Sequence, residues 1–329
     1  MPSLDNPPTL SVVIPLRDEM EVVGELHRRL AATLDALPID SEILFIDDGS
    51  ADDTPAILDR LRRRDPRLAV LTLSRNFGHQ AAVTAGLDHA RGDAVVVMDG
   101  DLQDPPELIA DMLALWEQGH EVVYAVRRRR REHVLKRFAY ASFYRLLGTV
   151  AELPIPADSG DFGLMDRKVV DALARMPERR RFVRGLRAYA GFRQIGLPYD
   201  RPARPAGRTK YKLADLIRLA TDGLVGFGGE PLRLVTRLGV VVALAAAMMT
   251  AWVVADALGH RTAPRGWASL VVVVLFMGSI QLLSLGIMGE YVRRIFDEVK
   301  ARPTYVVGRF EPSRGAVEVA EPRPRRARA

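Results

Sequence analysis

The chain has 329 residues, which is enough for one large α/β domain and an appendage. It contains no cysteine, so a disulfide scaffold, a thiolate metal site and a cysteine nucleophile are all excluded. The formal net charge is +6, and many arginines stand near the longest apolar runs. Such a charge indicates either an ordinary solvated basic surface or attraction to anionic lipid or phosphorylated substrates.

The first segment, residues 1–9, is polar and proline-rich, and we expect it to be disordered. It lacks the apolar stretch of a signal peptide, so the following domain is expected to stay in the cytoplasm.

Short β-branched runs then alternate with segments that carry apolar residues at helical spacing. In chain order, the expected elements are strand 10–15, helix 19–37, strand 42–46, helix 54–63, strand 68–73, helix 79–90, strand 94–98, helix 105–118 and strand 121–126. This alternation predicts an α/β fold with a mostly parallel, Rossmann-like sheet and helices on both faces.

Polar residues cluster where three of these strands end. Asp47 and Asp48 follow the second strand, Asn76 follows the third, and Asp99 follows the fourth. Ligands of parallel α/β sheets bind outside the carboxyl ends of the strands. We therefore expect these residues to line a substrate site.

Residues 127–212 are less regular, and we expect them to complete a catalytic domain over residues 10–212 and to close over the site. Residues 213–231 carry apolar side chains at helical spacing with charges elsewhere. This pattern predicts an amphipathic, interfacial helix on a membrane surface, although a helix packed on a protein core fits the same spacing.

Two uncharged runs follow within residues 232–292, at about 238–256 and 267–289. Each approaches the ~20 residues that a transmembrane helix needs, and the short loop between them favours a transmembrane hairpin over two buried helices. Basic residues are more frequent outside the hairpin than in its loop, which places both ends and the α/β domain in the cytoplasm. The protein is thus expected in the inner (cytoplasmic) membrane. Residues 293–329 are expected to form a cytoplasmic segment and a basic tail, disordered after Phe310.

The segment Asp99-Gly100-Asp101 directly follows a buried strand. Two carboxylates one residue apart suit a hard divalent cation such as Mg²⁺ or Mn²⁺, which prefers oxygen ligands. A diphosphate would supply the other oxygens, and the cation would neutralise the charge of this leaving group. A lone Asp-x-Asp also fits a solvated turn, so the prediction depends on the strand before it and on Gln103 and Asp104 after it.

Several strings together resemble polyisoprenyl-phosphate glycosyltransferases, which are inverting family 2 enzymes of the GT-A fold. Bactoprenol glucosyltransferases and relatives of dolichol-phosphate mannose synthase belong to this group, and the resemblance extends over roughly residues 10–300. The strings are Val13-Ile14-Pro15, Ile46-Asp47-Asp48-Gly49-Ser50, Ser74-Arg75-Asn76-Phe77-Gly78-His79-Gln80, Met98 to Glu107, Gly160-Asp161-Phe162, Arg181-Phe182-Val183-Arg184-Gly185 and Arg204 to Tyr211.

The resemblance implies transfer of a monosaccharide from a nucleotide sugar to polyprenyl phosphate, for modification of a cell-envelope glycan or glycolipid. UDP-glucose is the expected donor because the strings around Gln80 and Leu102-Gln103-Asp104 are closer to the bactoprenol enzymes. GDP-mannose or another UDP-sugar is the alternative donor. The resemblance also implies a homo-oligomer, with a tetramer as one option, held through the membrane helices.

The resemblance further implies roles for individual residues. By position, Pro15, Glu19 and Asp48 would line the nucleoside pocket, Asp99, Asp101 and Gln103 would hold metal and diphosphate, Arg127 and Arg131 (or Arg130) would meet the acceptor phosphate, and Arg204, Lys210 and Tyr211 would close over phosphates.

Asp161 matches the position proposed as the catalytic base of the family, and with Asp101 it is the expected catalytic residue. A phosphate monoester has a second pKa near ~6, so the acceptor is already largely a dianion at neutral pH and scarcely needs a base. Asp161 would then orient the acceptor or stabilise positive charge at the anomeric carbon. A loop aspartate that caps local backbone is the plain structural alternative.

Two departures from the family pattern bear on the site. Arg17 and Asp18 replace an aromatic residue and an asparagine, which weakens the expected nucleoside contacts there. Gly163 replaces an arginine beside Asp161. Either another arginine substitutes for it, or the acceptor binds differently.

Other classes of protein fit less well. A processive polysaccharide synthase needs more membrane helices and usually a Gln-x-x-Arg-Trp segment, and a dinucleotide enzyme needs Gly-x-Gly-x-x-Gly after a strand. The basic run at residues 127–131 lacks interleaved aromatics, so a nucleic-acid partner is not expected. A non-catalytic membrane scaffold that kept the fold is a further alternative, but intact Asp99, Asp101, Asp161 and Lys210 favour an enzyme.

Overall fold

The structure is a computed structural model. It describes residues 9–127, 159–179, 181–200 and 266–314, together with the positions 239, 241, 242, 244, 245 and 248. The chain divides into two compact units. The first contains residues 1–137, 155–210 and 302–329, and the second contains residues 138–154 and 211–301.

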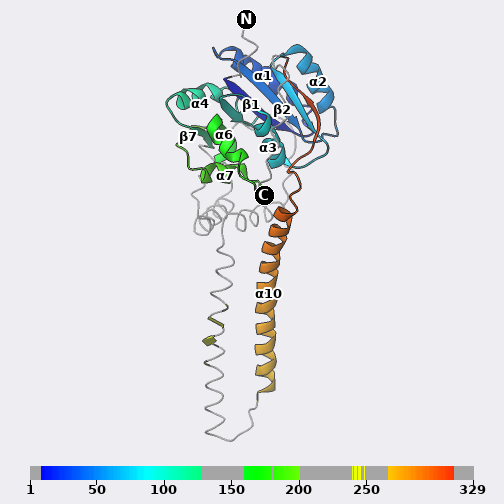
Figure 1. Ribbon diagram of the computed structural model, residues 1–329, viewed down its shortest axis with the longest axis vertical. Coiled ribbons are helices and arrows are strands. Elements are labelled where there is room, and N and C mark those ends of the chain that lie inside the picture. The colour runs from blue at the N-terminus through cyan, green and yellow to red at the C-terminus, as the bar shows by residue number, and fades with distance from the viewer. Residues whose placement is uncertain are drawn as a thin grey trace. The chain divides into compact units, whose positions relative to one another are not determined.

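The first unit is built on one sheet, whose described strands follow the order β7-β5-β6-β4-β1-β2-β3-β8 (Figure 1). Their bounds are β1 Leu10–Leu16, β2 Ser41–Asp47, β3 Leu68–Leu73, β4 Ala94–Val97, β5 Val122–Arg127, β6 Ser159–Asp166, β7 Gln194–Tyr199 and β8 Val307–Glu311. Strand β1 runs parallel to β2 and β4, β2 to β3, and β5 to β7. Strand β6 runs antiparallel to β4 and β5, and β8 to β3. The predicted mostly parallel α/β sheet is therefore confirmed, in a mixed form.

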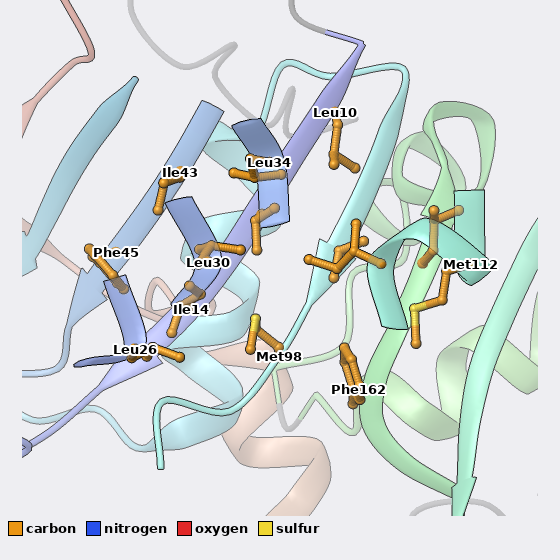
Figure 2. Packing of buried hydrophobic residues seen from close by; sticks show 14 of the residues in the cluster. Leu10, Ile14, Leu26, Leu30, Leu34, Ile43, Phe45, Met98, Met112 and Phe162 are labelled. Atoms are coloured by element: carbon orange, nitrogen blue, oxygen red, sulfur yellow. The ribbon is translucent and has the colours of Figure 1, made fainter. Parts of the chain in front are cut away.

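Helices α1 (Val23–Asp35), α2 (Thr54–Arg64) and α4 (Leu108–Glu117) cover one face of this sheet. Figure 2 shows Leu26, Leu30 and Leu34 of α1 over Ile14 and Phe45 of the strands. Four-residue spacing puts these leucines on one side of α1, so burying them fixes the helix on the sheet.

Helices α3 (His79–His89), α6 (Arg167–Ala174) and α7 (Val183–Tyr189) cover the opposite face. A Cβ at Gly86 of α3 would lie 2.2 Å from Val13 Cγ1 and 2.8 Å from Ile46 Cδ1. Only glycine lets α3 approach the sheet this closely. Helices on both faces are thus confirmed, and α3 and α7 bring their side chains to the carboxyl ends of the central strands.

Strand β6 was not expected, because residues 127–212 were interpreted as less regular. It inserts between β4 and β5, so these two strands are not neighbours. Its sequence includes Gly160, Asp161 and Gly163, which are poor strand formers. The pairing with two flanking strands therefore stabilises a segment whose own propensity is low.

The chain after the second unit returns to the sheet through β8, which pairs with β3. Beyond it, Ser313 is 5% exposed and the Arg314 N–H donates to the Pro66 carbonyl at 2.9 Å. The expectation that disorder begins after Phe310 was therefore wrong by at least four residues, and the rest of the basic tail lies outside the described residues.

In the second unit, α10 (Trp267–Val299) contains the second predicted membrane run and continues ten residues past Gly289. It exposes large apolar side chains along its length, including Leu270, Phe276, Leu282 and Leu285. Within the described part of the chain, no helix is both long and apolar enough to cross a membrane. The predicted amphipathic helix 213–231 and most of the first predicted run lie outside the described residues.

Candidate active site

The loops after β1 and β2 are joined by hydrogen bonds. Asp18 has a φ of 53°, its Oδ1 accepts the Ala51 N–H at 2.8 Å, and its own N–H donates to Ser50 Oγ at 3.0 Å. The Glu19 N–H donates to Thr54 Oγ1 at 3.0 Å. Aspartate and asparagine both tolerate the left-handed conformation and can accept such a bond. Asp18 therefore holds the loop as an asparagine would, and this departure from the family pattern keeps the backbone geometry.

Asp48, at the end of β2, holds the loop that precedes α3. Its Oδ1 accepts the Phe77 N–H at 2.7 Å and its Oδ2 accepts the Gly78 N–H at 2.9 Å. Burial raises the pKa of Asp48, although these two backbone donors oppose the shift. Beside it, Gly49 has a φ of 67°, and a Cβ there would lie 2.8 Å from the Asn76 nitrogen. The carboxylate of Asp48 is thus engaged with protein backbone, and a nucleoside contact for it stays a prediction.

Two further predicted residues lie close by, since Asp47 is the last residue of β2 and Asn76 lies in the loop after β3. Asp47 is 1% exposed, and its Oδ1 accepts the Ser50 N–H at 3.0 Å. Asn76 has a buried Nδ2 without a hydrogen-bond partner among the described residues. A buried amide donor without a partner is costly, so it is suited to an oxygen atom of a ligand.

The loop after β4 carries the predicted metal ligands. Oδ1 of Asp101 accepts the Gln103 N–H at 3.1 Å, and Leu102 between them has a φ of 61°. A Cβ at Gly100 would lie 2.2 Å from Leu16 Cδ2 and 3.2 Å from the Pro15 oxygen. Glycine at this position therefore lets the loop lie against the end of β1 and brings Pro15 beside the two aspartates.

Asp104 links this loop to β7 and β5. Its Oδ2 accepts the Asp99 N–H at 3.1 Å, and its Oδ1 accepts the Tyr199 hydroxyl at 3.1 Å. Arg127 also hydrogen-bonds to the Tyr199 side chain. Burial raises the pKa of Tyr199 to about 12, so its hydroxyl keeps its proton and can donate. The predicted acceptor-binding Arg127 is thus connected to the Asp99 loop through two buried side chains.

The antiparallel pairing of β4 with β6 brings two predicted carboxylates together. Val97 pairs with Gly163 at the end of this ladder, so Asp99 and Asp161 each lie two residues beyond the last pair. Nε2 of His79, at the start of α3, lies 3.3 Å from Asp161 Oδ2 and 3.7 Å from Asp99 Oδ1. One imidazole therefore stands between the predicted metal ligand and the predicted catalytic aspartate.

The carboxylate of Asp161 is held on both sides. Gln80 donates from Nε2 to Asp161 Oδ2 at 2.8 Å, and its Oε1 accepts the Val183 N–H at 2.9 Å, which ties α3 to α7. Nη2 of Arg184 lies 3.5 Å from Asp161 Oδ1. That oxygen is buried and receives no hydrogen bond from a described residue. Asp161 thus has one oxygen that is fixed by hydrogen bonds and one that lies near the charge of Arg184 without a hydrogen bond from a described residue.

These contacts decide the charge states. Burial alone would raise the pKa of Asp161, but the hydrogen bond from His79 and the charge of Arg184 outweigh it and hold the pKa well below its usual range. Burial would lower the pKa of His79, but Asp161 and Asp99 raise it to about 9. The pKa shifts favour an ionised Asp161, and the carboxylates of Asp161 and Asp99 both favour the protonated form of His79.

Several proteins align with nearly the whole length of this chain. An uncharacterized glycosyltransferase of Bacillus subtilis, YkcC, is 44% identical over 298 residues, which cover 90% of this chain and 92% of that protein. The family model "Glycosyl transferase family 2" matches residues 11–174. The chain belongs to glycosyl transferase family 2. It is therefore a glycosyltransferase.

Other relatives of this family 2 glycosyltransferase have more specific names. The prophage bactoprenol glucosyl transferase homolog of Escherichia coli is 38% identical, covering 92% of this chain and 99% of that protein. The bactoprenol glucosyl transferase of Shigella phage SfII is 38% identical, covering 91% and 97%. A solved glucosyl-3-phosphoglycerate synthase from Mycobacterium tuberculosis, in complex with Mn²⁺, UDP and glucosyl-3-phosphoglycerate, is 21% identical with a TM-score of 0.43, covering 68% of this chain and 80% of that chain.

The residues of this glycosyltransferase fit a substrate-shared metal ion. Among the described residues, no group of three or more His, Cys, Asp or Glu side chains is arranged to hold a metal. Asp99 and Asp101 supply only hard oxygen donors, and the Asp99 side chain is 33% exposed. Mg²⁺ is commonly held by one or two carboxylates together with substrate phosphates. The pair therefore suits a cation that shares its ligands with a diphosphate.

The structure brings the predicted Asp99 and Asp161 together, and it connects Arg127 to the Asp99 loop. The predicted phosphate-binding residues Arg131, Arg204, Lys210 and Tyr211 lie outside the described residues, and their roles stay predictions. Sequence reasoning assigned no role in the site to several residues that surround Asp161 or Asp99, namely His79, Gln80, Asp104, Arg184, Arg187 and Tyr199. His79, Gln80, Asp104 and Arg184 lie inside motif strings of the family, which could have marked them as site residues. Tyr199 lies in no such string.

Proposed function

We propose that this family 2 glycosyltransferase moves glucose from UDP-glucose to the phosphate of a polyprenyl lipid, giving a polyprenyl-phosphate sugar. The names of the bactoprenol relatives, which align over about nine-tenths of the chain, support this substrate pair. The observation that carries the proposal is the juxtaposition of Asp99 with Asp161 and Arg184, because it sets a diphosphate-metal site beside a carboxylate flanked by guanidinium groups.

On the donor side, Asp99 and Asp101, with Gln103, would hold Mg²⁺ or Mn²⁺ together with the diphosphate. When bound, the cation would supply positive charge that neutralises the departing diphosphate. Pro15 and Glu19 line the nucleoside pocket, next to the loops that Asp48 holds. Hard oxygen donors at the end of a parallel strand support this assignment.

On the acceptor side, Arg127 binds the lipid phosphate, since guanidinium forks match phosphate oxygens. Arg131 shares this contact, and Arg204, Lys210 and Tyr211 close over the phosphates. Connection of Arg127 to the Asp99 loop through Tyr199 and Asp104 supports a fixed distance between acceptor and donor.

An oxygen of the acceptor phosphate attacks the anomeric carbon from the side opposite the diphosphate. The new carbon–oxygen bond forms while the bond to the diphosphate breaks, and UDP leaves with the electron pair. The anomeric configuration is inverted. No proton has to move, because the acceptor is largely a dianion at neutral pH.

Asp161 acts here as a fixed negative charge rather than as a base. A carboxylate whose pKa is held far below its usual range is a weak base, which supports this role. Positive charge develops on the sugar ring as the diphosphate departs, and an ionised Asp161 stabilises it. The same contacts keep the carboxylate in one orientation.

The lipid acceptor calls for membrane association. We propose that residues of about 238–256 and 267–289 anchor the protein in the inner membrane, with the catalytic domain in the cytoplasm and the copies associating through these helices. The large exposed apolar side chains of α10 support this proposal, because soluble proteins rarely expose such a series.

The experiment uses the purified full-length protein with Mg²⁺ or Mn²⁺, polyprenyl phosphate and a panel of UDP- and GDP-sugars. Mass spectrometry of the lipid should reveal polyprenyl-phosphate glucose with UDP-glucose. Asp101→Ala should abolish the product, whereas Asp111→Ala, which removes an exposed carboxylate of α4, should not. Product from GDP-mannose or another UDP-sugar instead would correct the donor, and folded protein without lipid-linked sugar from any donor would refute the function.

A further inference from the structure

Gly163 of β6 leaves room for an arginine that comes from another element. Residues 161 and 163 share one face of the strand, because side chains alternate along it. A Cβ at Gly163 would lie 2.7 Å from the Val123 oxygen, 3.1 Å from Tyr124 Cα and 3.3 Å from Nη1 of Arg187. The space that a side chain at position 163 would need is therefore taken by strand β5 and by the Arg187 guanidinium.

Arg187 reaches this space from α7 and is almost fully buried, with 3% of its surface exposed. Its guanidinium carbon lies 5.2 Å from the centre of the Tyr124 ring. Its Nε has no hydrogen-bond partner among the described residues. Burial lowers the pKa of Arg187 to about 10, and the charge of Asp161 opposes this shift. A buried cation requires an opposite charge nearby, and Asp161 supplies it.

The contacts of Asp161 leave one of its two carboxylate oxygens without a hydrogen bond from a described residue. Gln80 and His79 act on Oδ2, whereas Oδ1 has only Arg184 at 3.5 Å and no hydrogen bond from a described residue. A second guanidinium, that of Arg187 beside Gly163, adds charge stabilisation without adding a hydrogen bond. Removing it would leave the Oδ2 anchors in place.

We propose that Arg187 is a positioning residue for Asp161: delivered from α7 into the space above Gly163, it supplies the positive charge that β6 itself lacks beside the carboxylate. This inference rests on the proposed function, since it assigns Asp161 its electrostatic partner. Arg184, at the more exposed rim of the same helix, stays available to the acceptor phosphate, whereas the buried Arg187 acts through Asp161.

The test is a double-mutant cycle of Arg187→Met and Asp161→Asn, measured by formation of the lipid-linked sugar. Arg187→Met keeps the length of the side chain and removes its charge. It should lower kcat by about 10²-fold, the size of effect that follows from misplacing a catalytic group, and leave the KM for the nucleotide sugar nearly unchanged. In the Asp161→Asn background the same substitution should lower kcat by less than about twofold, because residues that act as a unit are not additive.

Arg175→Met is the matched control, because Arg175 is an exposed arginine at the end of α6. It should leave kcat and KM unchanged. Arg187→Lys should recover part of the lost kcat, since it restores the charge. Equal losses from Arg187→Met with and without Asp161, or an unchanged kcat in the single variant, would overturn the proposal.

The same four proteins give a readout that does not depend on the assigned substrates. If Arg187 and Asp161 are charge partners, Arg187→Met should lower the midpoint temperature of unfolding in the wild-type background. In the Asp161→Asn background it should leave this temperature unchanged or raise it, because the buried cation there has no counter-charge. Wild-type protein that is inactive with every donor would refute the proposed function, while this thermal cycle still decides the pairing. Additive shifts would refute the pairing even in an active enzyme.

Discussion

The hydroxyl of Tyr199 donates a hydrogen bond to Oδ1 of Asp104 at 3.1 Å, although the two residues are 95 positions apart in the sequence. The other oxygen of Asp104 accepts the Asp99 N–H, and Tyr199 also hydrogen-bonds with Arg127. Through this chain of hydrogen bonds, the loop with the aspartates that are proposed to bind the metal and the arginine proposed at the acceptor phosphate share one buried support.

Removing the hydroxyl tests this support. Tyr199→Phe should destabilise the protein by about 1–3 kcal/mol, because the buried Asp104 oxygen loses a donor. It should also raise the KM for polyprenyl phosphate more than the KM for the nucleotide sugar, because Arg127 loses its partner. Thermal unfolding and initial rates measure the two effects. Tyr189→Phe, at a tyrosine that is 63% exposed, is the control and should change neither quantity. Equal effects of the two substitutions would contradict this shared support.

Gln80 provides a second test, because its amide fixes Asp161 Oδ2 and also binds the Val183 N–H. Gln80→Ala removes both hydrogen bonds and should lower kcat by about 10²-fold, since a misplaced catalytic group costs this much. Gln118→Ala, at the exposed end of α4, should leave kcat unchanged. A Gln80→Ala enzyme with wild-type kcat would show that Asp161 needs no such anchor.

How far the sequence predicts this molecule depends on whether the signal is local. The strands β1 to β5 and the helices between them match the expected ranges within a few residues, because continuous apolar runs and helical spacing are visible along the chain. Strand β6 was not predicted, because Gly160, Asp161 and Gly163 hide its strand character and its pairing with β4 and β5 decides its conformation.

The candidate site divides in the same way. Asp99 and Asp101 could be proposed from one short string. The link from Asp104 to Tyr199 and the approach of Arg187 to Gly163 join segments that are distant in sequence, and no spacing rule reveals them. The replacement of arginine by Gly163 showed only that a positive charge was absent from β6. The packing of Arg187 from α7 against Gly163 indicates which residue supplies that charge instead.

The hydrogen bonds of Asp65, which lies outside the candidate active site, predict that the stability of the protein depends on pH. Burial alone would raise the pKa of Asp65, but hydrogen bonds from His27 and Arg67 outweigh it and lower this pKa well below its usual range. The ionised carboxylate therefore stabilises the fold above its unfolded-state pKa of about 3.9, and this contribution is lost as the pH falls below that value.

The measurement compares wild type with Asp65→Asn between about pH 6 and pH 3, over which the carboxylate of the unfolded chain takes up its proton. At pH 6 the variant should be less stable by about 2 kcal/mol, the typical net value of hydrogen bonds to a charged group. The difference should shrink towards pH 3. Asp35→Asn, whose side chain is 66% exposed, should show a much smaller difference at every pH. A constant difference for Asp65→Asn would contradict the lowered pKa.

The close packing at Gly100 predicts a coupling between β1 and the loop that is proposed to bind the metal, because a Cβ at Gly100 would lie 2.2 Å from Leu16 Cδ2. Gly100→Ala should therefore overpack the loop, cost about 1–3 kcal/mol and lower activity by displacing Asp99 and Asp101. Shortening the neighbour should relieve the clash, so the further cost of Gly100→Ala in a Leu16→Ala background should fall below about 0.5 kcal/mol. The four proteins are compared by their midpoint temperatures of unfolding and by initial rates. If Gly100→Ala is as damaging in the Leu16→Ala background as in the wild-type background, the contact with Leu16 is not what requires glycine at position 100.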